Sequence, residues 1–463
     1  MTNAIKQTLR DSKKARWTAL VILSFTMFAG YMFTEVISPL KPIMERTLAM
    51  NSSDYGFITS AYGIFNVFLF MLIIVGMFLD RFGVRFSTIA SALIMIAGGI
   101  IKFAAFKGLI GSPDHIIHVP LLNLDLTTQV FWAGFGFALF GVGVEYAGIT
   151  VSKAVAKWFK GKEMALAMGM QVAIARLGSF APLAFGAKIA NTYDVATTVL
   201  IVVGFLILGL VGFFYYNILD KKLDTQISEE EDNSDEDKFK ISDLGIIISN
   251  RGFWLIALLC VSFYSTVFPF YKYGPDLMVN KFGVSENWAG LLPSLVPFGT
   301  MLLTPIFGSL YDKKGKGASI MMLGAVLLII VHVIFYLPFI TSVVAAFFNV
   351  LLLGIAFSLV PSAMWPSVPK IIPEKQLGSA FALIFWVQNF GLWGIPLAVG
   401  IVLDKTNPGV AEAKAAGEAI TYNYQTTWTI FVALTIVALL ISFWLKAEDK
   451  RKGYGLELPN IRN

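Results

Sequence analysis

Two ionisable residues of opposite charge lie in the middle of long apolar stretches of the sequence. Glu145 interrupts the stretch 127–152, and Arg176 interrupts the stretch 164–190. At about 1.5 Å per helical residue, they lie roughly 12 and 20 Å from the charged residues that end these stretches on one side. A charge at such depth in an apolar helix is costly, so it predicts a functional site.

The two charges together could bind a zwitterion. An arginine can hold a carboxylate through two parallel hydrogen bonds, and a glutamate can hold an ammonium group. The vertical separation of roughly 8 Å suits a dipeptide better than a single amino acid, whose two charges lie closer together. The alternative is a structural ion pair between Glu145 and Arg176, although apolar packing can replace such a pair at little cost to stability.

The composition identifies the environment of these charges. The chain has 463 residues, is 56% hydrophobic and 14% charged, and has a mean hydropathy of +0.71. Soluble domains have about 25% charged residues. Apolar stretches recur at a length of roughly 20 residues, which is the length that spans a bilayer. The sequence therefore predicts an all-α membrane protein.

Twelve transmembrane helices are expected, in two pseudo-symmetric bundles of six. They cover residues 17–38, 55–79, 86–106, 127–152, 164–190, 195–219, 252–273, 286–311, 318–337, 341–368, 378–402 and 425–445. The predicted domains are an N-terminal tail (1–16), a first bundle (17–219), an acidic linker (220–250), a second bundle (251–446) and a C-terminal tail (447–463). The linker is expected to be a flexible tether, with a regulatory role as the alternative.

The distribution of positive charge predicts the orientation in the membrane. Most of the 36 lysines and arginines lie in the tails and in the loops on the same side, which is typical of cytoplasmic loops. Both termini are therefore expected in the cytoplasm. Lys41, Lys102 and Lys272 are assigned to the opposite loops and the outer ends of spans. Short loops and compact termini favour the inner membrane of a bacterium.

Several classes of protein are not supported by the sequence. Cys260 is the only cysteine, and His115, His118 and His332 are scattered, so no metal site is expected. No nucleophile with a positioned base is evident, which argues against an enzyme. The basic residues form no single patch, so no nucleic acid partner is expected. We expect no cofactor, a small-molecule substrate, contact with membrane lipid, and a monomer.

A short motif occurs once in each half of the sequence, between the second and third spans of that half. The first copy consists of Gly76, Asp80, Arg81, Gly83 and Arg85, and the second of Gly308, Asp312, Lys313 and Gly315. Glycine permits a tight turn, and the charged residues can form contacts that break when a gate opens. Two copies favour a gate over a loop that sets only orientation. Because Lys313 and Gly317 replace arginines, the second gate is expected to be weaker.

The internal repeat adds candidates for the substrate site. When the halves are aligned, Arg176 matches Asn389 and Glu145 matches Ser358. One half would supply charge, and the other neutral hydrogen bonds and aromatic surface. The remaining candidates are Gln388, Trp386, Tyr31, Tyr264 and Glu35, and Glu35 has the outer rim as its alternative position.

The repeated motif resembles the signature loop of the major facilitator superfamily, and the resemblance covers the whole chain. The stretches 361–369, 377–380 and 388–391 more narrowly resemble the lysosomal dipeptide transporters grouped with major facilitator superfamily domain-containing protein 1. This resemblance implies uniport of dipeptides by alternating access. It also implies that Glu145 recognises the amino terminus of the peptide and Arg176 its carboxylate.

Other functions compete with dipeptide transport. A proton-coupled symporter of organic anions or sugar acids would bind the anion at Arg176 and carry a proton on Glu145 or Glu35. A sensor that resembles a transporter would bind a ligand without moving it. A pH gradient across proteoliposomes would separate the two transport mechanisms, because only symport acidifies the lumen as the substrate enters.

Overall fold

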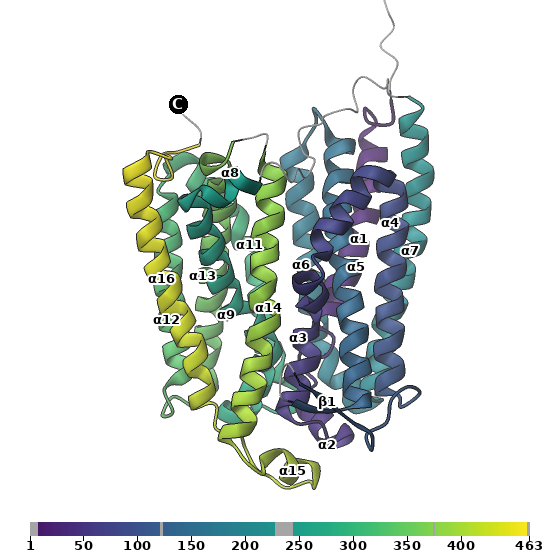
Figure 1. The fold of residues 1–463 in the computed structure, drawn as a ribbon, viewed down its shortest axis with the longest axis vertical. Helices are drawn as coiled ribbons and strands as arrows, with labels where there is room; N and C mark the ends of the chain where they lie inside the picture. Colours follow the sequence, from purple (N-terminus) through teal and green to yellow (C-terminus); the bar gives the residue numbers. More distant parts are fainter. Residues whose placement is uncertain (1–7, 121–123, 227–243, 374–375, 461–463) are drawn as a thin grey trace, which may run out of the picture.

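The structure is a computed structural model that describes residues 8–120, 124–226, 244–373 and 376–460. Long helices run roughly side by side in two groups, with α1 to α7 on one side and α9 to α16 on the other (Figure 1). We call these the first half and the second half. Most of the predicted acidic linker lies outside the described residues.

The first half begins with α1 (Lys13–Glu35), α2 (Lys41–Leu48) and α3 (Ser52–Phe68). It continues with α4 (Met71–Phe106), α5 (Thr128–Phe159), α6 (Met164–Thr192) and α7 (Val195–Asp224). A hairpin of β1 (Ile116–Val119) and β2 (Leu124–Thr127) joins α4 to α5, and its antiparallel register places Ile116 opposite Thr127.

The second half begins with α8 (Leu244–Ser249), α9 (Arg251–Phe282), α10 (Glu286–Ala289) and α11 (Leu291–Lys314). It continues with α12 (Gly317–Tyr336), α13 (Val343–Ile371), α14 (Leu377–Thr406), α15 (Val410–Ala415) and α16 (Gln425–Lys452). Several helices extend well beyond the predicted spans, and α9 continues to Phe282 where the prediction ended at residue 273.

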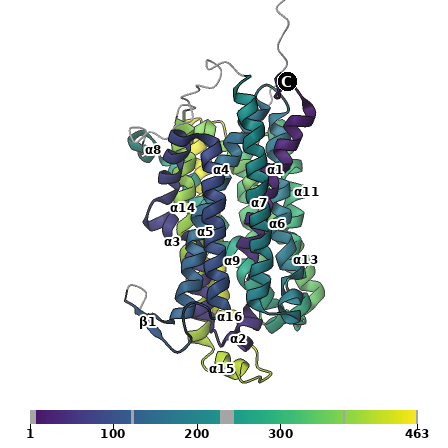
Figure 2. The ribbon, with the colours of Figure 1, turned by 90° about the vertical axis from the view of Figure 1, so that its right-hand side faces the viewer.

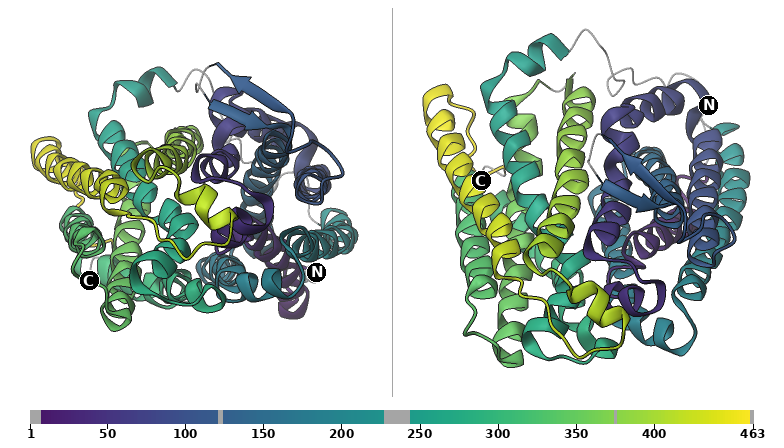
Figure 3. Two further views of the ribbon diagram at one scale, coloured as in Figure 1. Left: turned by 90° about the horizontal axis from the view of Figure 1, so that it is seen from below. Right: turned by 60° about the horizontal axis from the view of Figure 1, so that its bottom comes forward.

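The two ends of the molecule differ in what they carry. The start of α1, the end of α7 and the C-terminus lie at the top of Figure 1, which we call the terminus end. The short helices α2 and α15 and the hairpin lie at the opposite end, which we call the far end (Figures 1 and 2). Seen from the far end, α15 lies over the junction of the two halves (Figure 3).

Eleven described helical segments are long and apolar enough to cross a membrane, against twelve predicted spans. The difference arises at the second predicted span, because α3 has only 17 residues and a new helix, α4, begins at Met71. Within α4, Gly83 adopts φ 77° and ψ 174° and separates the helical segments 71–82 and 84–106. The prediction of one continuous helix over 55–79 is wrong. Instead α3 ends at Phe68, and Phe70 adopts a left-handed φ of 52° before α4 begins.

The outer helix faces and the inner contacts both fit a bilayer. On α7, Val211, Phe214 and Ile218 are each more than half exposed and lie on one stripe of the helix, where lipid would cover them. Inside the first half, α4 and α5 approach so closely that a side chain at Gly98 would lie 2.4 Å from the backbone of Gly136. Small residues at such crossings are typical of membrane helices.

The halves meet along two pairs of helices. α3 packs against α14, and α6 packs against α11. Both contacts depend on glycine, because a side chain at Gly56 would lie 2.9 Å from the Pro396 oxygen, and one at Gly290 would lie 2.0 Å from the Leu183 oxygen. The centre of the molecule is therefore bounded by helices of both halves.

Candidate functional site

Glu145 is held by one tyrosine hydroxyl and keeps part of its surface exposed. It lies on α5, and its Oε1 atom accepts a hydrogen bond of 2.7 Å from Tyr62 of α3. α3 and α5 touch at this level, since a side chain at Gly141 would collide with the backbone of Tyr62. Among the described residues, nothing donates to the other carboxylate oxygen. Glu145 can therefore accept a hydrogen bond from a ligand.

Arg176 makes neither a hydrogen bond nor an ion pair within the described part of the chain. It lies on α6, and its guanidinium carbon lies 5.2 Å from the centre of the Phe357 ring of α13. Its Nη1 atom is buried and has no hydrogen-bond partner. A structural ion pair between Glu145 and Arg176, which was the alternative from the sequence, does not form in this structure.

Tyrosines from both halves lie within electrostatic reach of the arginine. Tyr31 of α1 interacts electrostatically with Arg176 and with Glu145. Tyr264 and Tyr271 of α9 also interact with Arg176, and the Tyr271 hydroxyl is buried without a hydrogen-bond partner. The two halves therefore converge on the guanidinium. Sequence reasoning identified Tyr31 and Tyr264 but missed Tyr271.

Three neutral candidates of the second half are buried and already form hydrogen bonds within the protein. Asn389 donates from Nδ2 to the carbonyl four residues earlier at 2.9 Å, and Ser358 donates to the corresponding carbonyl on α13 at 2.7 Å. Gln388 accepts from the Cys260 thiol at 3.6 Å. These bonds lie within the second half. Asn389 also receives a long contact of 3.5 Å from Asn66 of α3.

Trp386 lies at the junction where α3 ends. Its indole N–H donates to the Val67 carbonyl at 3.0 Å, and its ring stacks on Phe70 with centroids 5.4 Å apart. The left-handed backbone at Phe70 interrupts the helix, so carbonyls near it lose their helical partners. The tryptophan of one half therefore caps the broken helix of the other.

Glu35 lies in the last turn of α1, at the far end. Its carboxylate forms a buried ion pair of 2.8 Å with Lys272 of α9 and accepts a hydrogen bond of 2.6 Å from Ser38. This ion pair joins the two halves. The predicted end of this span at residue 273 is wrong, because α9 continues for ten residues beyond Lys272.

A second buried charge cluster joins the halves at the far end. Lys41 of α2 contacts Asp276 of α9 at 3.0 Å and Glu45 at 2.5 Å, and it is fully buried. The carboxylate of Glu45 accepts from Tyr422 at 2.9 Å and lies 3.6 Å from Lys414. Lys41 thus lies in the connection between the first two long helices, where the sequence placed it, but it is buried in this cluster.

The first copy of the repeated motif is held within the first half. Asp80 pairs with Lys153 at 2.8 Å, and Arg85 pairs with Asp224 at 3.3 Å. Arg81 is exposed and lies over its neighbouring phenylalanine ring. A side chain at Gly76 would meet no atom within 4 Å. In this conformation, none of these contacts reaches the second half.

The second copy of the motif is held by the C-terminal segment 453–460. Asp312 accepts from the Asn460 side chain at 2.7 Å, whereas Lys313 is exposed. The N–H of Gly317 donates to the Leu456 carbonyl at 2.9 Å. A side chain at Gly308 would meet open space. Among the described residues, ion pairs at the terminus end stay within one half, whereas several at the far end cross between halves.

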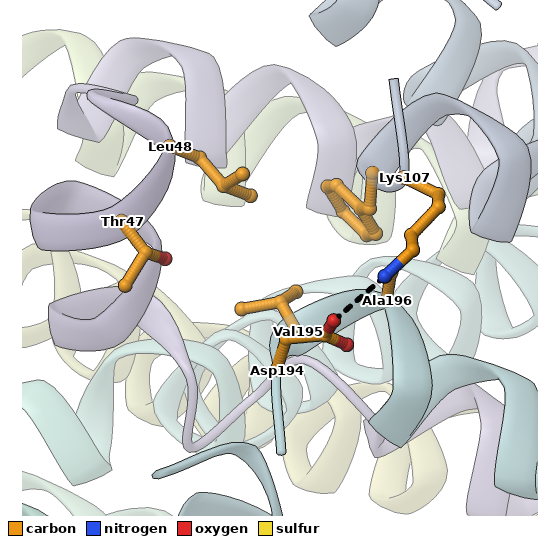
Figure 4. Close-up of a pocket in the computed structure, with 7 residues that line it drawn as sticks. Thr47, Leu48, Lys107, Asp194, Val195 and Ala196 are labelled. Carbon is orange, nitrogen blue, oxygen red and sulfur yellow. Dashed lines mark hydrogen bonds and ion pairs between the residues drawn. The ribbon is translucent and has the colours of Figure 1, made fainter. Parts of the chain in front are cut away.

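A separate pocket of about 260 Å³ lies at the far end of the first half (Figure 4). It is lined by Thr47, Leu48, Phe106, Lys107, Asp194, Val195 and Ala196. Lys107 and Asp194 form an ion pair of 3.0 Å beside it. Hydrogen bonds from Thr197 hold the pKa of Asp194 below its usual range. None of the predicted substrate residues lines this pocket.

In the described residues, no group of three or more His, Cys, Asp or Glu side chains could hold a metal ion.

The fold and the buried polar centre define the chain as a multi-pass membrane transporter. A family model of the Major Facilitator Superfamily matches residues 23–396. The chain belongs to this superfamily.

Curated relatives include dipeptide transporters. The chain is 27% identical to the lysosomal dipeptide transporter MFSD1 of Danio rerio over 454 residues, which cover 96% of this chain and 89% of that protein. It is 26% identical to MFSD1 of Homo sapiens over 401 residues, which cover 84% and 80%. The hexuronate transporter of Escherichia coli K12 is 24% identical over 270 residues, which cover 54% of each chain.

Solved structures share the fold. A bacterial homologue of the human lysosomal transporter Spinster, in an inward-facing and unoccupied conformation, superposes with a TM-score of 0.69 at 14% identity. The superposition covers 95% of this chain and 98% of that one. The nucleoside transporter NupG gives a TM-score of 0.67 at 14% identity, covering 93% and 99%. At these identities the likeness shows the fold alone.

Proposed function

We propose that this protein transports small zwitterionic solutes, above all dipeptides, by alternating access. The observation that carries the proposal is the state of Arg176. It is a guanidinium in the middle of a long apolar helix, it lies over an aromatic ring of the other half, and it has no anion of its own among the described residues.

A carboxylate is the ligand that such an arginine needs. A charged group inside a membrane protein requires a partner, and guanidinium binds carboxylate through two parallel hydrogen bonds. Glu145 supplies the opposite charge, and Tyr62 occupies only one of its oxygens. A solute with a carboxylate at one end and an ammonium group at the other satisfies both residues at once.

Two further observations support the dipeptide over other zwitterions. Glu145 and Arg176 form no ion pair with each other among the described contacts, so each charge is available to bind one end of a solute. Relatives named as dipeptide transporters match the chain over most of its length.

We propose uniport as the mechanism. We also propose that the carboxylate of the peptide binds Arg176 and that its amino group binds Glu145.

Alternating access is supported by the difference between the two ends. At the far end, buried ion pairs join the halves, whereas at the terminus end the motif residues bond within their own half. We propose that the terminus end faces the cytoplasm of a bacterial cell. The structure then represents the inward-facing state, in which the repeated motifs are released and the far end is locked.

The proposal is tested by ligand-induced thermal stabilisation of purified protein. Alanyl-alanine should stabilise the wild type, because a ligand that binds only the folded state raises its stability. N-acetyl-alanyl-alanine, which lacks the ammonium group, and alanyl-alanine amide, which lacks the carboxylate, should stabilise it much less. Equal stabilisation by all three compounds would contradict the two-ended site.

Variants assign the two ends of the peptide. Arg176→Ala should abolish stabilisation by alanyl-alanine, with a loss of affinity of about a hundredfold for a charge-assisted contact. Glu145→Gln should remove the discrimination against the acetylated peptide. Arg251→Ala is the matched control, because that arginine is exposed and lies far from the site, 4.0 Å from Glu448. Unchanged affinity in Arg176→Ala would refute the assignment.

A second candidate function is proton-coupled symport of organic anions or sugar acids. It is favoured by the match to a hexuronate transporter over about half of the chain. Arg176 would then bind the anion, and Glu145 or Glu35 would carry the proton. In proteoliposomes, acidification of the lumen during uptake would support symport, and uptake without any proton movement would support uniport.

A further inference from the structure

Lys102 is a buried lysine that the transport site does not use. It lies on α4 of the first half, has no exposed surface, and its Nζ atom makes no hydrogen bond within the described part of the chain. Its nearest groups are aromatic, since Nζ lies 3.6 Å from the centre of the Phe137 ring and 5.4 Å from that of Phe33. Ring faces attract a cation, but they do not replace a carboxylate in an apolar interior.

The carboxylate within electrostatic reach of Lys102 is Glu35, and another lysine occupies it. Glu35 pairs with Lys272 at 2.8 Å. Both lysines interact electrostatically with Glu35, and the Nζ atom of Lys272 lies 6.0 Å from the same Phe137 ring. Lys102 belongs to the same half as Glu35, whereas Lys272 belongs to the other half. Two lysines from different halves therefore compete for one carboxylate.

The neighbouring cluster shows why this matters when the halves separate. Lys41 and Glu45 both lie on α2, four residues apart, so their ion pair stays intact when the two halves move apart. Asp276 and Lys414 both belong to the second half and interact electrostatically. Each half of that cluster therefore keeps its own counter-charge. Lys102 belongs to the same half as Glu35 and interacts with it electrostatically, so it can provide such a reserve for Glu35.

We propose that Glu35 exchanges its lysine partner during the transport cycle. Lys272 binds Glu35 while the far end is closed, and Lys102 binds it when the far end opens and Lys272 leaves with the second half. Lys102 thereby acts as a positioning residue that stabilises the open far end. The proposal rests on the alternating access of the proposed function, but it does not depend on which solute is carried.

The exchange predicts opposite effects for the two lysines. Lys102→Met removes the partner of the open state, so the ratio of open to closed far ends should fall by at least about tenfold. Lys272→Met removes the partner of the closed state, so the ratio should rise. In a Glu35→Gln background, Lys102→Met should cause no further shift, because the shared carboxylate is gone.

The ratio can be measured by spin-label distances across the far end. Asp114→Cys and Thr341→Cys place exposed labels on the two halves, and the natural Cys260 is fully buried. Wild type and variants are compared without substrate. Lys107→Met is the matched control, because Lys107 is a lysine at the end of the same helix that pairs with Asp194 at the surface. It should leave the distances unchanged.

Each outcome decides a different point. An unchanged or increased open fraction in Lys102→Met would overturn the exchange, as would an added shift in the Glu35→Gln background. Lys102→Arg keeps the charge and should retain the distribution of the wild type, which covers the case in which Lys102→Met does not fold. If the wild type shows a single distance with and without alanyl-alanine, alternating access itself fails, which is a separate result.

Discussion

The two ends of this transporter hold their charges in different ways. At the far end, Lys41 and Asp276 form a fully buried ion pair between the halves. At the terminus end, Asp80 pairs with Lys153 of its own half, and both side chains keep exposed surface. The far end therefore needs new partners for buried charges before it can open, whereas the terminus end has no described ion pair between halves to break.

The comparison teaches where the energetic cost of the cycle lies. Breaking a buried ion pair leaves an uncompensated charge, whereas exposed pairs contribute little. Opening of the far end should therefore be governed by the partners that each half keeps for itself. The terminus end should be governed by backbone geometry and by the segments that hold its loops.

The strongest way to break the comparison is to remove one charge of the buried pair. Asp276→Asn should lower the free energy of unfolding by about 3 kcal/mol and favour an open far end, because Lys41 is left with Glu45 alone. Arg46→Ala, which breaks the exposed pair with Glu286 at the same end, should cost at most about 1 kcal/mol. Thermal unfolding of both variants measures the difference, and equal losses would contradict it.

A smaller effect is expected from the turn of the first motif. Gly83→Ala should destabilise the terminus end by about 1 to 3 kcal/mol, because φ is 77° there and a Cβ atom is strained in that conformation. Gly76→Ala is the matched control, since Gly76 lies in a helical segment of α4 and a Cβ atom at either position meets no atom within 4 Å. Hydrogen exchange of residues 80–86 should rise in the first variant alone. Similar hydrogen-exchange rates in both variants would argue against backbone strain at Gly83→Ala.

The smallest effect is expected at the second motif, where a side chain of the C-terminal segment caps a helix. The Glu457 carboxylate accepts from the Ser319 N–H at 2.8 Å, in the first turn of α12. Glu457→Ala should therefore cost about 1 kcal/mol, which is typical of a lost cap. Thermal unfolding and protection of the 315–319 amides would report it. If Glu457→Ala lowered the free energy of unfolding as much as Asp276→Asn, the contacts of the terminus end would contribute as much to stability as those of the far end.

Much of the architecture could be predicted from periodicity and composition. Apolar runs located nearly every membrane helix, and the glycine of the first motif marked the turn at Gly83. The helix break at Phe70 could not be predicted, because the residues 68–70 are apolar and include neither glycine nor proline. The break is stabilised by a tertiary contact, since Trp386 of the other half bonds the Val67 carbonyl there.

The sequence could place Glu145 and Arg176 near the middle of their helices, but it could not predict their partners. Counting residues along a helix could not show that Tyr62 would bond one and Phe357 would lie over the other. Lys272 was assigned to an outer loop or span end because a charge was taken to end an apolar run. Its carboxylate partner lies on another helix, far away in the sequence.

The C-terminal segment also bears on the order in which the protein is completed. Residues 453–460 bind the loop between α11 and α12, and the ribosome makes them after every helix of both halves. The corresponding loop of the first half is held by Asp224, which is available when less than half of the chain has been synthesised. The first half can therefore mature during translation, whereas the second half is finished only when translation passes residue 460.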